Sequence, residues 1–441
     1  MFGTSGIRGP FGATVDTGLA RRIGRALAAC EYDRVVVGRD GRETGEILVD
    51  ALAAGARECG TDVVRLGRVA TPTLARSVAR QDADAGVVVT ASHNPPADNG
   101  FKFWTPSGTA FGEERRAALE TALDERRGQT APWDALGSAS RVANATARHR
   151  AAICESVPDL SDLRVVVDVG NGMGGVTVDA LRDLGATVET LNADVDGRFP
   201  ARSSEPTAET CESLCAGVAA TDAQLGVAHD GDADRAMAVD ESGAFVGGDE
   251  LLALFATTAL ANGDGGRVAV PVDTSLLVAD AVAGAGGTVE RTPVGDVFVA
   301  EAAREAEVVF GGEPSGAWIW PDETLCPDGP LAACRLAAVV AERGPLSALV
   351  DEFAGYPIRR ESIDTDAKAA VMDAVTETVH ERYDDVSTLD GVRVDGDDGW
   401  FLVRASGTQP LVRVTAEARD PDRADDLLAA ATALVETARD G

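Results

Sequence analysis

An alternation of short β-branched runs with helix-length segments recurs three times along this chain and constrains its fold more than any other feature. The rounds begin near residues 34, 163 and 267. Such alternation predicts α/β domains, in which helices cover a sheet. The predicted strands are 34–37, 62–66, 85–89, 163–169, 187–191, 224–228, 267–272, 288–291 and 307–310, the predicted helices are 49–59, 73–79, 176–184, 276–283 and 331–343, and 236–239 with 244–246 form a predicted hairpin.

The pattern changes after residue 357. Residues 391–394, 399–404 and 411–416 predict antiparallel strands, and a closing helix is predicted over 422–438. A length of 441 residues exceeds one ordinary domain. We therefore expect four domains, which are three similar α/β domains with mixed sheets at 1–145, 146–245 and 246–355, and a smaller α+β domain at 356–441.

The chain is strongly acidic, with 72 acidic against 40 basic residues and a formal net charge of −32. Only Lys102 and Lys368 are lysines. A surplus spread over the whole chain repels nucleic acid and anionic membranes, and it suits a salt-rich cytosol in which self-repulsion is screened. We expect a halophilic source. In a chain that avoids lysine, each remaining lysine is a candidate for a specific role.

The sequence favours a cytoplasmic location. It has no run of about 18 apolar residues that could cross a membrane, and its first residues lack the basic and apolar regions of a signal peptide. The seven cysteines are an odd number, and the close pair Cys211 and Cys215 lacks metal-ligand spacing. We expect free thiols in a reducing compartment.

Ser92 lies in the loop Thr90–Pro95, directly after the predicted strand 85–89. Active sites of α/β proteins gather where strands end, so this serine is a candidate nucleophile. The alternative is a turn closed by a serine or asparagine side chain. Lys102 follows closely, and its rarity favours a functional role over a solvated surface position.

The loop 230–235, with the sequence DGDADR, is the most specific motif. Its three aspartates alternate with small residues that let the backbone curl, so the carboxylates can converge on one hard cation such as Mg²⁺. An EF-hand is excluded, because the sixth position is not glycine and the twelfth is not glutamate. The alternative is an acidic turn in an acidic protein.

Two further loops are polar. Glu313 and Ser315 in the loop 311–316 can hydrogen-bond neighbouring sugar hydroxyls, although Pro314 can equally mark a simple turn. In the loop 404–410, the guanidinium of Arg404 suits a phosphate, and a hairpin turn is the alternative. The phosphate would also be wrapped by Ser406, Gly407 and Thr408.

A glycine-rich segment at 170–175 also precedes a predicted helix. Glycine spacing alone is weak evidence for a dinucleotide site, and the acidic partner expected about 20 residues later is ambiguous. We reject that interpretation. The four loops instead supply a nucleophile, a metal site, a polyol binder and a phosphate binder, which together indicate phosphoryl transfer on a sugar phosphate.

These motifs, together with the GTSGIRG segment at 3–9, resemble the α-D-phosphohexomutase superfamily over essentially the whole chain, and most of all its archaeal-type phosphoglucosamine mutases. The resemblance implies four domains around a central cleft, with a mobile last domain. It implies that a phosphoserine gives its group to a hexose 6-phosphate, and that a hexose 1,6-bisphosphate forms, reorients and returns the other phosphate. One Mg²⁺ per chain and hexose phosphates as partners follow, and we expect a monomer or homodimer.

The resemblance also implies roles for individual residues. Ser92 would carry the phosphoryl group, and its phosphate would complete the metal site of the three aspartates. Lys102 would be a candidate for proton transfer, and His93, beside the serine, would either hold neighbouring residues in place without touching the substrate or handle a proton. The implied positions are Ser92, Asp230, Asp232 and Asp234 for the metal, Arg8, Lys102, His93 and Arg235 around the transferring phosphate, Glu313 and Ser315 for the sugar, and Arg404, Ser406, Gly407 and Thr408 for the other phosphate.

Two positions depart from the pattern of many relatives. Ala317 stands where many carry histidine, and Val297 stands where many carry a basic residue. They leave the chemistry intact and the sugar open: glucosamine phosphate is our first expectation, and mannose or glucose phosphate is the alternative. A sugar phosphatase and a non-catalytic sugar-phosphate sensor are more remote alternatives, and the phosphatase has no need of a second phosphate site at Arg404.

Overall fold

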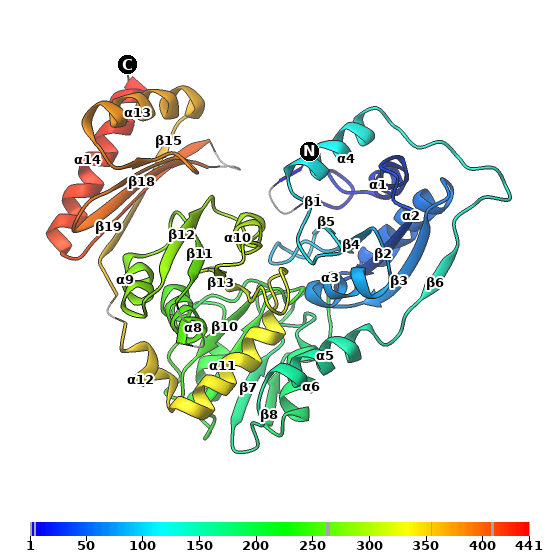
Figure 1. The fold of residues 1–441 in the computed structure, drawn as a ribbon, viewed down its shortest axis with the longest axis horizontal. Helices are drawn as coiled ribbons and strands as arrows, with labels where there is room; N and C mark the ends of the chain where they lie inside the picture. Colours follow the sequence, from blue (N-terminus) through cyan, green and yellow to red (C-terminus); the bar gives the residue numbers. More distant parts are fainter. Residues whose placement is uncertain (1, 4–5, 262–264, 354, 407–409, 441) are drawn as a thin grey trace.

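A computed structural model describes the chain except for residues 1, 4–5, 262–264, 354, 407–409 and 441. In the described part, the strands form four separate sheets that follow one another along the chain. The first unit, in blue and cyan, and the fourth, in orange and red, lie on opposite sides of the view, with the second and third units between them (Figure 1). The chain is therefore an α/β protein of four units that ends in an antiparallel sheet.

The first unit has a six-stranded mixed sheet in the order β1-β5-β4-β2-β3-β6. Its central strands β2, β3 and β4 pair in parallel, while β5 runs antiparallel to β4 and β1. Every residue of β4 is buried, as its uninterrupted apolar sequence requires. The elements are β1 Ile7–Pro10, α1 Thr17–Ala29, β2 Arg34–Arg39, α2 Gly45–Arg57, β3 Asp62–Arg68, α3 Thr71–Arg80, β4 Ala85–Val89, β5 Asp98–Trp104, α4 Glu113–Asp124 and β6 Ala139–Arg141.

The second and third units each have a four-stranded mixed sheet, in the orders β10-β9-β7-β8 and β12-β11-β13-β14. One apolar cluster joins them, so that Leu225 of the second sheet and Phe310 of the third belong to the same core. The elements are α5 Ala145–Ser156, β7 Arg164–Asp168, α6 Gly175–Asp183, β8 Thr187–Leu191, α7 Glu212–Ala219, β9 Leu225–His229, β10 Ala236–Val239, α8 Gly248–Ala261, β11 Arg267–Pro271, α9 Leu276–Gly284, β12 Thr288–Thr292, α10 Asp296–Ala302, β13 Val308–Glu313, β14 Ala317–Ile319, α11 Gly329–Arg343 and α12 Leu346–Val350.

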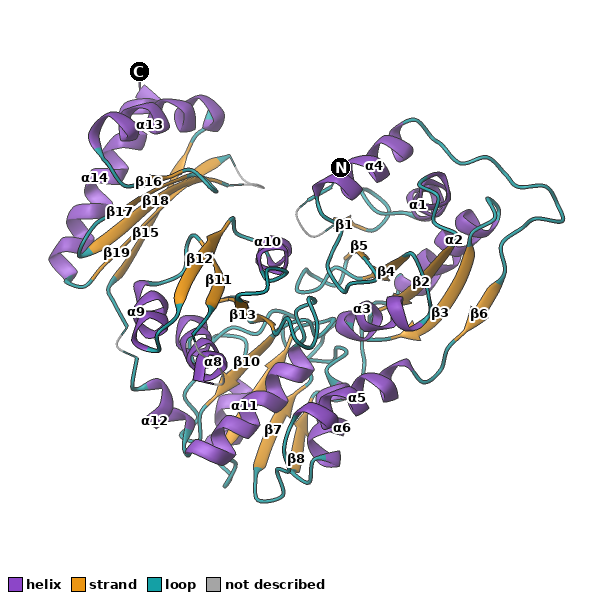
Figure 2. Ribbon diagram, viewed as in Figure 1, coloured by secondary structure: helices purple, strands orange, loops and turns teal. Residues whose placement is uncertain are grey.

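The fourth unit has an antiparallel sheet in the order β15-β19-β18-β17-β16, with α13 and α14 packed together against it (Figure 2). Its core is separate from the others and is rich in valine and alanine. The elements are β15 Ile358–Asp364, α13 Lys368–Arg382, β16 Val386–Ser387, β17 Val392–Asp395, β18 Gly399–Ala405, β19 Leu411–Ala418 and α14 Pro421–Asp440.

The buried Glu417 connects the fourth unit to the third. It accepts hydrogen bonds from the Ser275 hydroxyl at 2.5 Å and from the backbone N–H of Leu276 at 2.7 Å. Arg393 donates across the same boundary to the carbonyl of Val272. These contacts set the fourth unit against the carboxyl end of β11, where the third unit's polar residues lie.

The predicted hairpin at 236–239 and 244–246 is present, with a short second arm. β10 pairs antiparallel with β9. Phe245 also forms an antiparallel bridge with Val239, and the backbone N–H of Val246 donates to the carbonyl of Ala238 at 2.9 Å. The carboxylate of Asp240 holds the turn between the two arms, because it accepts hydrogen bonds from the backbone N–H groups of Ser242 and Ala244 at 2.8 and 3.0 Å. Among the described residues, no helix is long and apolar enough to cross a membrane.

Candidate active site

Ser92 follows β4 in a tightly held loop. Its backbone has a φ of +50°, a left-handed conformation that is uncommon for a residue with a side chain, and its backbone N–H donates to Thr90 Oγ1 at 2.9 Å. The side chain is almost fully buried. Such a constrained backbone fixes the direction in which the Ser92 side chain leaves the loop.

Arg42, which the sequence analysis missed, organises this loop. Its fully buried guanidinium donates to the carbonyls of Ser92 and Asn94 at 2.9 and 2.7 Å, and to those of Pro95 and Asp98 at 2.6 and 2.9 Å. Asp40 balances its charge through a 3.1 Å ion pair. Because its donors are occupied by backbone carbonyls, this buried arginine holds the loop in shape, as a template for it, and does not bind substrate.

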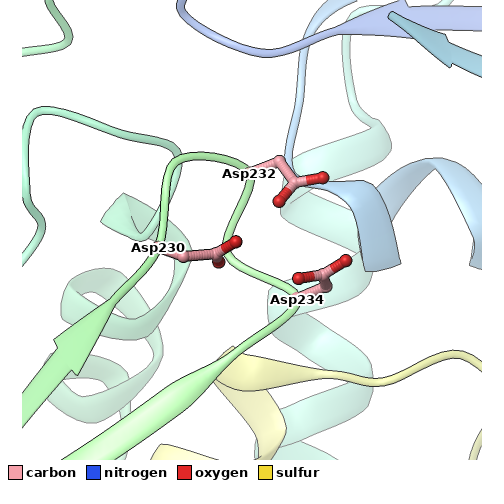
Figure 3. Close-up of side chains that lie close together, drawn as sticks. All are labelled: Asp230, Asp232 and Asp234. Atoms are coloured by element: carbon pink, nitrogen blue, oxygen red, sulfur yellow. The ribbon is translucent and has the colours of Figure 1, made fainter. Parts of the chain in front are cut away.

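Asp230, Asp232 and Asp234 are buried in the loop between β9 and β10, and their carboxylates point toward one another (Figure 3). One oxygen from each lies within 4.8 Å of the others. The Ser92 hydroxyl donates to Asp230 Oδ2 at 2.6 Å, so the two predicted motifs meet. Ala233, with a φ of +57°, makes the curl that brings the three side chains together.

The triad fits a hard cation. Asp232 Oδ1 is buried and has no hydrogen-bond partner in the described part of the chain, which leaves an oxygen aimed at a ligand. Burial, with the charges of the neighbouring aspartates, raises the pKa of both Asp230 and Asp234. A divalent cation would relieve that mutual repulsion. Three carboxylate oxygens and a serine oxygen are the donor set that Mg²⁺ prefers.

Lys102 comes from β5, in the first unit, and reaches the same loop. Its ammonium donates to Asp232 Oδ2 at 3.0 Å and also to Asp234. Burial acts to lower the pKa of Lys102, but the charges of these two aspartates outweigh it and raise the pKa above its ordinary value. Asp232 Oδ2 also accepts from the Thr71 hydroxyl at 2.5 Å, at the start of α3.

Three further predicted residues lie around Ser92. The Arg8 Nε is a buried donor with no partner among the described residues, as expected of a group that awaits an anion. Arg235 donates to Glu205 at 3.1 Å. Burial, followed by the charges of Arg235 and Arg8, lowers the pKa of His93 to about 3, and the His93 Nδ1 lies 3.5 Å from the Ser92 Oγ.

Glu313 is the last residue of β13, which runs three residues beyond the predicted strand end at 310. Its carboxylate accepts from the backbone N–H of Gly295 at 2.8 Å and from the Ser315 hydroxyl at 3.3 Å. Burial, followed by the charge of Asp296, raises its pKa to about 7. Ala317 pairs with Glu313 across β14, while Val297 is buried in α10.

Of the residues predicted to bind the second phosphate, the structure describes Arg404, near the end of β18, and Ser406. Arg404 donates to Asp390 at 2.9 Å, and Asp390 also accepts from the backbone N–H of Val294 at 3.1 Å. Ser406 is buried, and its carbonyl accepts from Lys368 at 2.5 Å. Gly407 and Thr408 lie outside the described residues. Lys368, the second lysine of the chain, therefore also lies at a predicted phosphate loop. The rarity of lysine in this sequence was the signal that could have identified it.

One cavity of about 610 Å³ brings these loops together. All four units contribute to its walls. Asp230 and Asp232 do not line the cavity themselves, but they contact the lining residues Ser92 and Lys102, respectively. A larger cavity of about 850 Å³ is lined by Phe255, Trp320 and Arg335 and contains none of the predicted residues. The predicted residues that line the smaller cavity are Arg8, Ser92, His93, Lys102, Asp234, Arg235, Glu313, Ser315 and Arg404.

Comparison with known proteins agrees with this arrangement. Family models for phosphoglucomutase/phosphomannomutase match in chain order, with alpha/beta/alpha domain I at residues 1–129, domain II at 147–243, domain III at 247–356 and the C-terminal domain at 359–434. Fold and site together define an enzyme that moves a phosphoryl group between two positions of a hexose phosphate, a phosphosugar mutase. The chain belongs to the phosphoglucomutase/phosphomannomutase family.

Similar proteins include curated relatives and solved structures. A protein of Methanopyrus kandleri named probable phosphoglucosamine mutase is 47% identical, over 97% of this chain and 95% of its own length. One of the same name from Methanococcoides burtonii is 43% identical over 99% of both chains. A phosphoglucomutase/phosphomannomutase family protein from Burkholderia thailandensis superposes with a TM-score of 0.88 at 32% identity, covering 99% of this chain and 98% of that one.

Proposed function

We propose that this mutase interconverts glucosamine 6-phosphate and glucosamine 1-phosphate, with Ser92 carrying the phosphoryl group. The observation that carries this proposal is the 2.6 Å hydrogen bond from the Ser92 hydroxyl to Asp230, within a buried cluster of three aspartates. It supports the proposal because the serine oxygen lies beside three carboxylates that could share one cation. Mg²⁺ held there by Asp230, Asp232, Asp234 and the serine phosphate would neutralise charge on the transferring group.

The protein's own residues position the reactants. The left-handed backbone at Ser92, held by Arg42, directs the serine oxygen toward the triad. Arg8, Lys102 and Arg235 line the pocket around it and provide fixed positive charge where the phosphate oxygens would lie. Lys102 and His93 line the same wall and are the candidates for exchanging a proton with the sugar hydroxyl that attacks the phosphorus.

The transfer occurs twice, in opposite directions. In the first step, the bond between the serine oxygen and phosphorus breaks, and a bond forms between phosphorus and the free hydroxyl of the hexose monophosphate. The resulting hexose 1,6-bisphosphate reorients in the pocket, and its other phosphate returns to Ser92. The reaction needs a site for the phosphate that is not reacting, which we assign to Arg404, Ser406, Gly407 and Thr408, and a sugar clamp, which we assign to Glu313 and Ser315.

A sugar phosphatase would transfer the group from Ser92 to water. Arg404 argues against this, because it lines the same cavity as Ser92 but comes from the fourth unit, and a phosphatase needs no such second phosphate group. Two lines support glucosamine over mannose or glucose. The relatives from Methanopyrus kandleri and Methanococcoides burtonii bear the name of a phosphoglucosamine mutase. Glu313 also lines the pocket, and a carboxylate there would suit an ammonium group on the sugar.

The test is kcat/KM of the purified protein for glucosamine, glucose and mannose 6-phosphates, in one buffer with molar KCl, Mg²⁺ and a trace of hexose 1,6-bisphosphate as activator. Glucosamine phosphate should be turned over at least as well as the others. A preference for glucose or mannose phosphate above about tenfold, or about 1.4 kcal/mol, overturns the glucosamine assignment and leaves the mutase chemistry standing.

The proposal also covers the compartment, the assembly state and the domain boundaries. We place the enzyme in a salt-rich cytoplasm because of its net charge of −32. We expect it to be a monomer or a homodimer. We place the domain boundaries near residues 145, 245 and 355. Size-exclusion chromatography in molar KCl measures the assembly state, and limited proteolysis tests the boundaries.

A further inference from the structure

The third unit gives the pocket an acidic wall. Within the described residues, it contributes four carboxylates to the lining and no lysine or arginine. The basic side chains lie on the first, second and fourth units instead. The acidic lining residues of the third unit are Asp249, Asp273, Asp296 and Glu313, those of the second and fourth units are Asp234 and Asp390, and the basic lining residues are Arg8, Lys102, Arg235, Arg360 and Arg404.

Asp296 lies at the end of this wall that it shares with Lys102. It begins α10 directly after Gly295, whose backbone N–H donates to Glu313 at 2.8 Å. Asp296 and Lys102 line the main cavity and also share the lining of a small adjoining one. Since Lys102 contacts the aspartate triad, Asp296 belongs to the reactive end of the pocket.

Asp273 lies at the opposite end. It follows β11 beside Val272, whose carbonyl accepts from Arg393 of the fourth unit. Asp273 and Arg404 line the same pocket, and Asp390, which accepts from Arg404 at 2.9 Å, also accepts from the backbone N–H of Val294 in the third unit at 3.1 Å. Asp249 lies close by, accepting from the backbone N–H of Ser275 at 3.1 Å. Asp273 therefore belongs to the end of the pocket that holds Arg404.

On the basis of the function proposed above, we propose that Asp296 and Asp273 are paired receptors for the protonated C2 amine of the sugar, one for each orientation of the substrate. C2 is bonded to C1, so the amine always lies near whichever end holds C1. Glucosamine 6-phosphate presents its C1 hydroxyl to Ser92, which brings the amine to Asp296. Glucosamine 1-phosphate has C1 at the Arg404 end, which brings the amine to Asp273.

The chemistry of the wall favours an amine over a hydroxyl. A hydrogen bond between an ammonium and a carboxylate is stronger than one from a neutral hydroxyl, and the difference grows in a partly buried pocket. The same carboxylates repel phosphate, which keeps both phosphates at the basic ends while the bisphosphate turns. A single receptor would stabilise only one orientation, whereas two keep the amine paired in both.

Dead-end analogues separate the two orientations. A glucosamine 6-phosphate analogue without the C1 hydroxyl, and a glucosamine 1-phosphate analogue without the C6 hydroxyl, cannot accept a phosphoryl group. On the phosphorylated enzyme, each binds with its phosphate at the Arg404 end. We expect Asp296→Asn to weaken the inhibition constant of the first analogue about tenfold, and Asp273→Asn that of the second, against changes of less than about twofold for the matching glucose analogues.

Asp322→Asn is the matched control, since it removes one negative charge from the exposed surface of the third unit outside this pocket. It should leave all four inhibition constants unchanged. Equal changes for the amino and hydroxyl analogues, or no change in either variant, overturn the receptor proposal. Failure of the glucosamine assignment itself is detected separately, by the kcat/KM comparison on the unmodified enzyme.

Discussion

The hydroxyl of Ser92 donates a 2.6 Å hydrogen bond to Asp230, although 138 residues separate the two along the chain. Ser92 follows β4 of the first sheet and Asp230 follows β9 of the second, so strand ends from two units meet at this contact. Thr71 and Lys102, also from the first unit, bind Asp232 of the same loop. The reactive end of the pocket is therefore an interface between the first two units.

Asp232→Asn should lower Mg²⁺ affinity and reduce turnover by at least an order of magnitude, because it removes one charged ligand from the site. The fold should persist, since Lys102 keeps its contact with Asp234. Magnesium titration of activity measures the effect, with Asp322→Asn as the charge control. A chelator should silence the native enzyme reversibly, and full activity in excess chelator would exclude the metal site.

Arg42→Met should destabilise the first unit by about 3–5 kcal/mol, because it leaves the buried carboxylate of Asp40 unpaired. Urea unfolding in molar KCl measures this loss. Arg42→Lys keeps the charge but has three donors in place of the five of arginine. It should therefore retain more stability than the methionine variant while still losing activity. Native unfolding and native kcat in both variants would contradict the template role of Arg42.

Stability should rise with salt into the molar range. A net charge of −32 repels itself, and the Debye length falls to about 3 Å at 1 M salt, which screens most of that repulsion. The melting temperature measured from low to molar KCl tests this expectation. A flat or falling melting temperature over that range would refute the inference of a halophilic source.

Asp249 should make stability depend on pH. Burial, as the largest cause, raises its pKa from 3.8 to about 6, so the folded protein favours the protonated form. Its contribution is fully present below pH 3.8 and is lost as the pH rises through about 6. Relative to the wild type, Asp249→Asn should gain melting temperature as the pH increases from 4 to 7. Asp322→Asn should show no such gain, and parallel curves for Asp249→Asn and wild type would contradict the shift.

Much of the architecture could be predicted from the sequence because buried strands are continuous apolar runs. The predicted strand at 85–89 coincides with β4, and that at 163–169 contains β7, in which residues 165–168 are buried. Polar residues that interrupt such runs stand out, which is why Ser92 and the aspartate loop were recognisable. The rarity of lysine singled out Lys102 in the same way.

Other features depend on contacts between distant segments. Arg42 binds carbonyls more than 50 residues away, and nothing in its local sequence distinguishes it from a surface arginine. The acidic wall is similarly assembled from residues that are scattered between positions 249 and 313.

The most direct test of the account is the intact mass of the protein after incubation with glucose 1,6-bisphosphate and Mg²⁺, compared between the native chain and Ser92→Ala. The native protein should gain one phosphoryl group and lose it on addition of excess hexose monophosphate, whereas the variant should gain none and lose turnover by several orders of magnitude. A phosphorylated Ser92→Ala protein, or a variant with near-native activity, would contradict the assignment of Ser92 as the phosphoryl carrier.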